Sequence, residues 1–482
     1  MSAQSSLDPD ALPQIIGDFR PVDQWQIHIN DVFYGLRGNR LREFYQTFAS
    51  ADYRLAYALA GDYYRRLGQR DQRHDSGGDN AQQDAESALI VMEWGCGNGN
   101  LAACFLDRFK ELDVSGRYYP RLQYQLIDKN AVVLEEARNN PAFARHQAKV
   151  TFTNGRVEDL QEFQDGTVDR IICNELWSEL PTKLILRKAS ELREEQIRPN
   201  VSESKLAEIQ DWSGFVQAFD QKDIQVLREF PSFLEDLVWE REYHEVEAKS
   251  LSFRRTISEF MKHIDEEVLV PINTGASASI KEAMRLLSPD AIGMSAFDAG
   301  TADSQVLNDP DKPCYSVHGG QFSFMVNFAL LEDIGRHLGA KNLVIEAQRE
   351  FVGNGLGENV LTLMDLLAAH PRLPESDSWE FDALVVRTLE VINSGYASPY
   401  RQTIDFPIRE STPADERAKL SAILGGLNPN GLPDTIAYIT ESEIRKVQSS
   451  LEELGYDGEG IRMILQMPPN LVDYTHFFLS SS

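Results

Sequence analysis

The chain has 482 residues, 42% of them hydrophobic and 25% charged, an ordinary composition for one large globular domain or two smaller ones. Its 75 acidic residues outnumber the 47 basic ones and give a formal net charge of −28. A field of that sign opposes the phosphate contacts on which nucleic-acid affinity depends. We therefore expect no nucleic-acid partner, whereas a basic protein segment is easy to accommodate.

We also expect no membrane contact and no metal site. No apolar run reaches the roughly 18 residues that a spanning helix needs. The opening MSAQSSLDPDALPQ lacks the basic and apolar segments of a signal peptide, so we expect a cytoplasmic protein, with an organelle matrix as the alternative. The cysteines, which form no CxxC pair and no metal-ligand spacing, are Cys96, Cys104, Cys173 and Cys314.

The first 87 residues divide into a helical region and a polar linker. Aromatic and apolar residues recur three and four apart from Phe44 to Leu67, which predicts packed amphipathic helix within a helical N-terminal region, residues 1–68. Residues 69–87 are polar, contain glycine and are nearly free of apolar residues, which predicts a surface linker.

From Ala88 on, short β-prone runs alternate with helical segments, a pattern typical of βαβ units and a parallel sheet. The predicted strands are Ala88–Glu93, Leu122–Asp128, Lys149–Thr153 and Val168–Cys173, and the predicted helices are Leu101–Leu112 and Ala131–Asn139. We therefore expect an α/β fold in which residues 88–182 form the first, ligand-binding part of the sheet.

The remainder of the chain is predicted in three parts. Residues 183–287 are charged and helix-prone, as in LILRKASELREEQIR, and predict a mainly helical insertion on the substrate side in which LVWEREYHEVEA is a candidate exposed strand. The sheet resumes over 288–400, with expected strands at Ala291–Phe297, Asn342–Ala347 and Ala383–Val391. Residues 401–482 mix turns with helical segments such as ESEIRKVQSSLEELG.

A glycine-rich stretch, EWGCGNGN, follows the first predicted strand. Gly95, Gly97 and Gly99 alternate, and a helix begins directly after them with Asn100 as its candidate N-cap. Such a turn lets backbone approach a ligand closely. The GxGxxG fingerprint of NAD-binding proteins fails at Asn100, and a P-loop fails because no Lys-Ser or Lys-Thr follows.

With Glu93 two residues before the first glycine, this stretch resembles motif I of the class I S-adenosylmethionine-dependent methyltransferases. The resemblance implies a Rossmann-like methyltransferase sheet, and it implies that Glu93, Gly95, Gly97 and Gly99 contact S-adenosyl-L-methionine. The chemistry agrees, because a carboxylate suits the cationic end of this cofactor and a helix N-terminus suits its carboxylate.

Two further acids are expected at the ends of the next strands. Asp128 ends the second predicted strand, where a carboxylate can accept both ribose hydroxyls. After the third strand the family commonly places an acid at the adenine amino group, and here either Glu158 or Asp159 fills that position.

The fourth predicted strand ends in NELWSELP, residues 174–181. Neither the D/N-P-P-Y motif of amino-directed DNA enzymes nor the Pro-Cys pair of cytosine C5 enzymes is present there. The segment resembles the Asn-Glu-x-x-x-x-Leu-Pro signature of the MidA-like methyltransferases, a family that includes a mitochondrial complex I assembly factor described as a protein arginine methyltransferase. The resemblance covers roughly residues 40–360, and it departs from the family at Gln321 and Asn327, which replace acids, and at Met325, which replaces histidine.

The resemblance implies methylation of a protein arginine, for which the residues at the fourth strand are suited. Glu175 can orient a guanidinium, since Arg–carboxylate pairing is bidentate and directional, while Asn174 orders the cofactor side. Glu179 would share a helical face with Glu175 if the segment turns helically. We predict in-line methyl transfer to an arginine in a basic protein segment; the alternatives are a small-molecule methyltransferase and a catalytically inactive binding or assembly protein with this fold.

Overall fold

The structure is a computed structural model that describes residues 14–37, 53–75, 87–189, 191–247, 249–399, 401, 404, 406–433, 437–467 and 474–481. Within these ranges, none of the helices has both the length and the apolar character needed to cross a membrane.

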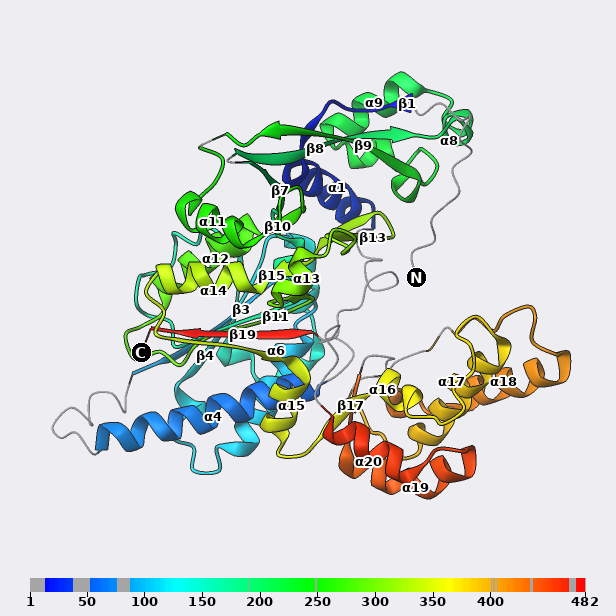
Figure 1. Cartoon of the computed structure of the whole chain (residues 1–482). Helices are drawn as coiled ribbons and strands as arrows, with labels where there is room; N and C mark the ends of the chain where they lie inside the picture. The colour runs from blue at the N-terminus through cyan, green and yellow to red at the C-terminus, as the bar shows by residue number, and fades with distance from the viewer. Residues whose placement is uncertain are drawn as a thin grey trace.

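A seven-stranded sheet forms the centre of the molecule, with strand order β16-β19-β11-β6-β3-β4-β5 (Figure 1). Its strands are β3 (Leu89–Trp94), β4 (Leu122–Asp128), β5 (Val150–Asn154), β6 (Arg170–Asn174), β11 (Gly293–Asp298), β16 (Asn342–Ala347) and β19 (Thr475–Ser480). Strands β3, β4, β5, β6 and β11 pair in parallel, and β19 lies antiparallel between β11 and β16. The predicted Rossmann-like α/β sheet is confirmed, but its strand β19 comes from a region that was not expected to contribute one.

Helices cover both faces of this sheet, because its strands bury side chains on both sides. Val91 packs with the helices of one face, and Met92, the next residue, packs with those of the other. The covering helices are α4 (Arg54–Asp75), α6 (Asn100–Leu112) and α15 (Gln348–Leu356) on the first face, and α11 (Arg254–Phe260), α12 (Thr274–Leu286) and α14 (Phe328–His337) on the second. Helix α7 (Ala131–Arg138) follows β4 as predicted.

Helix α4 corrects the boundary of the predicted linker. The helix continues to Asp75, so the first residues of the range 69–87 are helical, because charged side chains on its solvent face do not interrupt a helix. The part of the predicted N-terminal helix from Phe44 to residue 52 lies outside the described residues.

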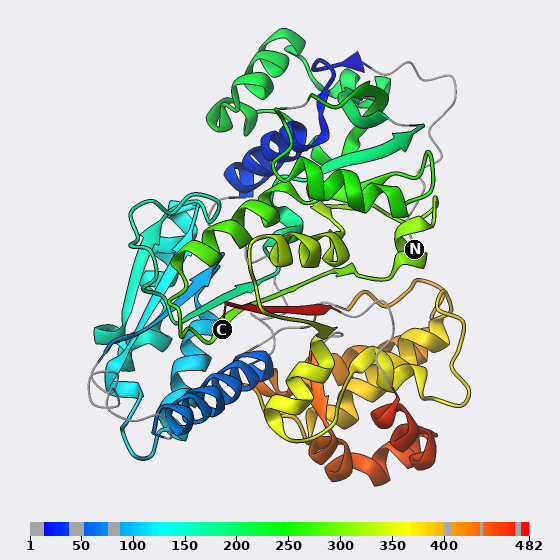
Figure 2. The ribbon, with the colours of Figure 1, turned by 60° about the vertical axis from the view of Figure 1, so that its left-hand side comes forward.

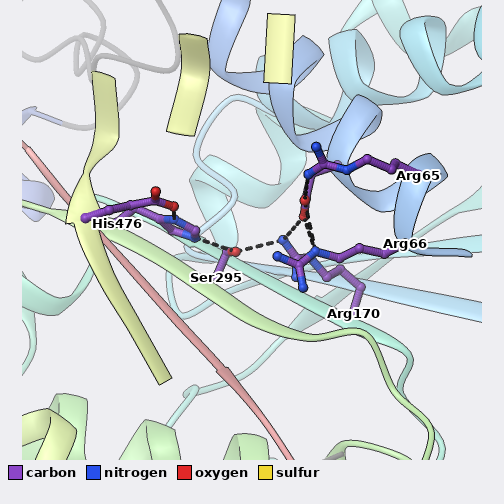
Figure 3. A network of polar contacts seen from close by, with 7 residues as sticks. Arg65, Arg66, Arg170, Ser295 and His476 are labelled. Carbon is purple, nitrogen blue, oxygen red and sulfur yellow. Dashed lines mark hydrogen bonds and ion pairs between the residues drawn. The ribbon is translucent and has the colours of Figure 1, made fainter. Parts of the chain in front are cut away.

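A buried network of charged and polar side chains joins α4 to four strands of the sheet (Figure 3). Arg170 on β6 donates to Asp62 on α4 at 3.3 Å and to the hydroxyl of Ser295 on β11 at 2.7 Å. Ser295 in turn lies 2.8 Å from Nε2 of His476 on β19, whose Nδ1 is 2.9 Å from Glu346 on β16. Buried charges are tolerated only when paired, so this chain of contacts fixes which strand sits beside which.

A second, antiparallel sheet lies above the first in Figure 1 and packs against α1. Its strands are β1 (Gln14–Ile15), β2 (Arg20–Pro21), β7 (Lys183–Lys188), β8 (Glu191–Val201), β9 (Leu237–Glu245) and β10 (Val270–Ile272). The helices beside it are α1 (Val22–Arg37), α8 (Glu203–Glu208), α9 (Trp212–Gln221) and α10 (Ile224–Leu227).

This sheet corrects the predicted mainly helical insertion of residues 183–287. The segment LILRKASELREEQIR forms the hairpin of β7 and β8, whereas the predicted exposed strand in LVWEREYHEVEA is confirmed as β9. The hairpin is favoured because β8 buries two acids with partners on other strands: Glu194 accepts from Lys183 at 2.8 Å, and Glu195 accepts from Tyr243 at 2.9 Å.

The C-terminal helices gather on one side of the molecule, beside α15 (Figures 1 and 2). They are α16 (Leu363–Ala368), α17 (Trp379–Asn393), α18 (Ala414–Gly426), α19 (Glu441–Leu454) and α20 (Gly458–Gln466), with β17 (Val360–Thr362) paired to β18 (Tyr438–Thr440). The strand predicted at Ala383–Val391 is wrong, because that run lies within α17, where Ser378 caps the helix and the apolar residues pack as a helical stripe. The helix predicted in ESEIRKVQSSLEELG is confirmed as α19.

Short elements complete the described fold. They are α13 (Ser304–Asn308), β12 (Gly300–Thr301) paired to β15 (Val326–Asn327), the hairpin of β13 (Tyr315–His318) and β14 (Gln321–Phe324), and the 3-10 helices at 119–121, 141–145, 147–149, 177–179, 234–236, 261–263 and 429–431.

Candidate functional site

A cavity of about 160 Å³ lies at the carboxyl ends of β3, β4 and β6. Every loop that follows these strands contributes to its wall, because parallel strands bring their carboxyl ends to one edge of the sheet. We call it the central cavity. The predicted site residues that line it are Glu93, Gly95, Gly97, Asp128, Glu158, Asn174 and Glu175.

The three glycines of the turn between β3 and α6 all adopt left-handed backbone. Gly95, Gly97 and Gly99 have φ of 69°, 52° and 76°, a region that other residues rarely enter. At Gly97 a Cβ would meet no described atom within 4 Å, so its backbone faces open space in the cavity wall. At Gly99 a Cβ would lie 2.6 Å from the ring of Phe143, so this glycine allows close packing and does not itself line the cavity.

The start of α6 differs from the expected cap. Gly99 is the N-cap, and Asn98 supplies the side-chain oxygen that accepts the backbone N–H of Asn100 at 3.0 Å. The side chain of Asn100 instead accepts from Asn140 at 3.0 Å. The turn is therefore held by side chains on both sides of it, and Asn98 and Leu101, on either side of the helix start, line the cavity.

Glu93 brings a buried carboxyl to the cavity wall. The side chain is 4% exposed, and its Oε2 accepts a hydrogen bond of 2.7 Å from the hydroxyl of Tyr124. Burial raises the pKa of Glu93 to about 8, and the bond from Tyr124 only partly offsets this effect. A positively charged ligand beside it would favour the ionised form, so the residue is suited to bind a cation.

Asp128, at the end of β4, lies on the neighbouring wall. Loss of water around its carboxyl raises its pKa to about 6, opposed by backbone hydrogen bonds from Asn130 at 2.8 Å and from Gly97. Of the two acids proposed for the third position, Glu158 lines the cavity and pairs with Arg156 at 3.0 Å. Asp159 is exposed and is not among the described residues of the wall.

Asn174 and Glu175 end β6 on the far side of the cavity. Glu175 has φ of 48°, unusual for a residue with a side chain, and its N–H is held by the carbonyl of Phe297 at 2.8 Å. Asn174 donates to the Glu175 carboxylate at 3.2 Å, while its Oδ1 is buried and has no hydrogen-bond partner among the described residues. The residue with strained backbone, Glu175, and the unused acceptor of Asn174 thus line one cavity, which is consistent with a site for donor groups of a ligand.

The segment after Glu175 does not turn as an α-helix. Only Trp177–Glu179 forms a short 3-10 helix, so the helical condition for Glu175 and Glu179 to share a face is not met, although both line the cavity. Asp298, at the end of β11, accepts the backbone N–H of Ser178 at 3.0 Å and fixes this segment. Burial raises the pKa of Asp298 to about 6.

Two residues at the site were not predicted from the sequence. Tyr34 of α1 lines the cavity, donates to Glu179 at 2.5 Å and accepts from Gln321 at 3.0 Å. Asp298 could have been found as an acid at the end of a buried strand, the signal that identified Asp128. No spacing or motif points to Tyr34, because it reaches the cavity only through the packing of α1.

The cavity wall is strongly acidic. Six acids of the described chain line it against two basic residues: Glu93, Asp128, Glu136, Glu158, Glu175 and Glu179, with Lys129 and Arg156. S-adenosylmethionine fits these acidic residues, since its ammonium and sulfonium are cationic and its diol donates hydrogen bonds. The glycine turn leads to a helix N-terminus, which is suited to the carboxylate of the cofactor.

The sequence model of the family described as "Putative S-adenosyl-L-methionine-dependent methyltransferase" matches residues 79–344, more than half of the chain. Two crystal structures of superfamily members from Burkholderia thailandensis are similar to this chain at 17% identity and a TM-score of 0.45. One covers 75% of this chain and 80% of its own; the other, which is bound to S-adenosyl-homocysteine, covers 73% of this chain and 78% of its own. No curated protein matches the chain.

Proposed function

The chain belongs to this family of S-adenosyl-L-methionine-dependent methyltransferases, and from that membership we propose that it methylates an arginine side chain of a protein. The observation that carries the arginine assignment is the pair Glu175 and Glu179 on the cavity wall beyond the glycine turn. Two carboxylates on one wall suit a planar cation that donates several hydrogen bonds.

The remaining wall residues would hold the cofactor, which supplies an electrophilic methyl group when bound. Glu93 would pair with the ammonium of the cofactor. The turn at Gly95 and Gly97, which carries no side chains at these positions, would leave room for the methionine part of the cofactor. Asp128 would accept the ribose hydroxyls, and Glu158 would accept from the adenine amino group. The roles of Glu93 and Asp128 would explain why these two acids with raised pKa values line one edge of the sheet.

On the acceptor side, Glu175 would orient the guanidinium and Asn174 would hold Glu175 in place. In an in-line displacement the acceptor nitrogen forms a bond to the methyl carbon while the bond from that carbon to sulfur breaks. The nitrogen then loses a proton, which passes to a cavity carboxylate, for which Glu175 is placed. Because the reaction needs only this displacement and the loss of one proton, the alignment of the acceptor nitrogen with the methyl group supplies most of the rate enhancement.

The test uses the whole chain with tritium-labelled S-adenosylmethionine and peptides that contain a single arginine, or lysine in its place. We expect label on the arginine peptides, and we expect Glu175→Gln to lower transfer about 10- to 100-fold while S-adenosylhomocysteine binding by calorimetry is retained. Asp159→Asn, an exposed neighbour outside the cavity wall, is the matched control. Label on lysine peptides alone, or full transfer by Glu175→Gln, would contradict the assignment.

A further inference from the structure

A second hollow opens from the central cavity at the C-terminal end of α1. Three described residues, Tyr34, Lys129 and Asn130, line both spaces, so the two are continuous. We call the second hollow the outer groove; its lining residues are Asp31, Tyr34, Gly35, Leu36, Arg37, Lys129, Asn130, Ala131, Val132 and Arg228. Any acceptor that reaches the cavity past α1 must pass over this groove.

Tyr34 forms the boundary between the two spaces and is held firmly. Its hydroxyl donates to Glu179 and accepts from Gln321 at 3.0 Å, while Nζ of Lys129 lies 5.9 Å from the centre of its ring. The position where the family has an acid is occupied here by Gln321, which is uncharged and can donate to the phenol. Tyr34 therefore has an acid at its hydroxyl and a cation near its ring, and that cation, Lys129, lines both spaces.

The charge of the outer groove is opposite to that of the cavity. Its described lining contains Arg37, Lys129 and Arg228 and a single acid, Asp31. That acid is already paired, at 2.7 Å with Lys222 and at 3.9 Å with Lys129. In a chain of net charge −28, a positive groove directly beside an acidic cavity creates a steep local field.

Arg228 is the residue best placed to meet an incoming group. It follows α10, its side chain is exposed, and one of its nitrogens, Nη2, donates to the carbonyl of Gly35 at 2.8 Å. That bond anchors the guanidinium at the groove. Because the guanidinium is planar, the bond also fixes the directions of its other N–H groups.

We propose that the outer groove binds an anionic group of the methyl acceptor, so that the preferred acceptor is an arginine with an acidic residue close to it in the chain, and not an arginine in the basic segment expected from the net charge. The proposal rests on the proposed arginine specificity: the acidic cavity takes the guanidinium, and Lys129 and Arg228 take the carboxylate. Since the two spaces share Tyr34, Lys129 and Asn130 and are continuous, and an extended chain advances about 3.4 Å per residue, the acid stands within a few residues of the arginine.

The experiment measures binding of fluorescein-labelled peptides by anisotropy, with S-adenosylhomocysteine at saturating concentration. The peptides carry one arginine among glycines, flanked on both sides by glutamate, glutamine or lysine. We expect the glutamate-flanked peptide to bind wild type about three- to tenfold more tightly than the glutamine-flanked one at low salt. In the double variant Lys129→Gln, Arg228→Gln we expect this advantage to disappear. It should persist in the control variant Arg138→Gln, which replaces an exposed arginine of α7 outside the groove.

Equal binding of the glutamate- and glutamine-flanked peptides, stronger binding of the lysine-flanked peptide, or no binding of any peptide would overturn the proposal. An advantage of glutamate that survives in the double variant would overturn it as well. If the glutamate-flanked peptide keeps its advantage after its arginine is replaced by glutamine, the groove assignment stands and the arginine specificity falls. The two proposals therefore fail by different results.

Discussion

Replacing Glu93, the buried acid of β3, should stabilise the cofactor-free protein and weaken its binding of the cofactor. Glu93 is 4% exposed, and burial raises its pKa to about 8 from an ordinary 4.5. Between these two values the folded protein holds a proton that the unfolded chain has released, so the free energy of unfolding falls as pH rises from about 5 to 8. At pH 7.5 the shift corresponds to about 4 kcal/mol of lost stability.

Glu93→Gln removes the titrating group and keeps an oxygen that can accept from Tyr124. We expect the variant to gain about 2–4 kcal/mol in free energy of unfolding at pH 7.5, to gain little at pH 5, and to lose about tenfold or more in S-adenosylhomocysteine affinity. Urea unfolding at pH 5 and pH 7.5, together with calorimetry, measures all three quantities. Asp159→Asn, an exposed acid, serves as the control and should change none of them.

The reasoning would be refuted if Glu93→Gln lowered the stability of the free protein, or if its stability varied between pH 5 and pH 8 as steeply as that of wild type. Either result would mean that the carboxyl is ionised in the free protein and stabilised by groups other than Tyr124. Unchanged cofactor affinity in a stabilised variant would instead remove Glu93 from the binding site.

Three other substitutions test separate parts of the structure. Asp128→Asn should weaken S-adenosylhomocysteine binding by about tenfold in calorimetry, through loss of a charged acceptor, and unchanged affinity would exclude its role at the ribose. Gly99→Ala should cost about 1–3 kcal/mol in urea unfolding, since its φ is 76° and the new Cβ would lie 2.6 Å from Phe143; a smaller loss would mean that the ring moves freely. Arg170→Met should cost about 1–3 kcal/mol in the same assay, because it removes one buried partner of Asp62, which keeps Arg65 and Arg66, and a neutral effect would show that the network adds specificity without stability.

The wall of the central cavity at the ends of β3, β4 and β6 could be predicted because its signals are local. Glu93, the glycine turn and the start of α6 are contiguous, and Asp128 and Asn174 each end an apolar run that could only be a buried strand. Parallel strands bring such ends together whatever the rest of the fold does. The positions of the strands were therefore enough to predict which of these residues line the central cavity.

The part of the wall that α1 contributes could not be predicted, because distant segments form it. Tyr34 meets Glu179 and Gln321 across long stretches of chain, and nothing in the α1 sequence marks that contact. The same limit explains the hairpin of β7 and β8: residues such as Leu, Arg, Lys and Glu favour a helix locally, but cross-strand partners for Glu194 and Glu195 outweigh that preference.

The position of β19 has a consequence for how the protein folds as it is synthesised. This strand is inserted between β11 and β16, pairing Met294 with Leu479 and Leu343 with the same residue, although the segments are far apart in the chain. Until residues 475–480 emerge from the ribosome, two strands with apolar surfaces face an open gap, and β16 has no neighbour in the sheet. Such a nascent chain would expose unpaired strand edges for the time needed to translate the C-terminal helices, and during that time these edges can pair with other chains.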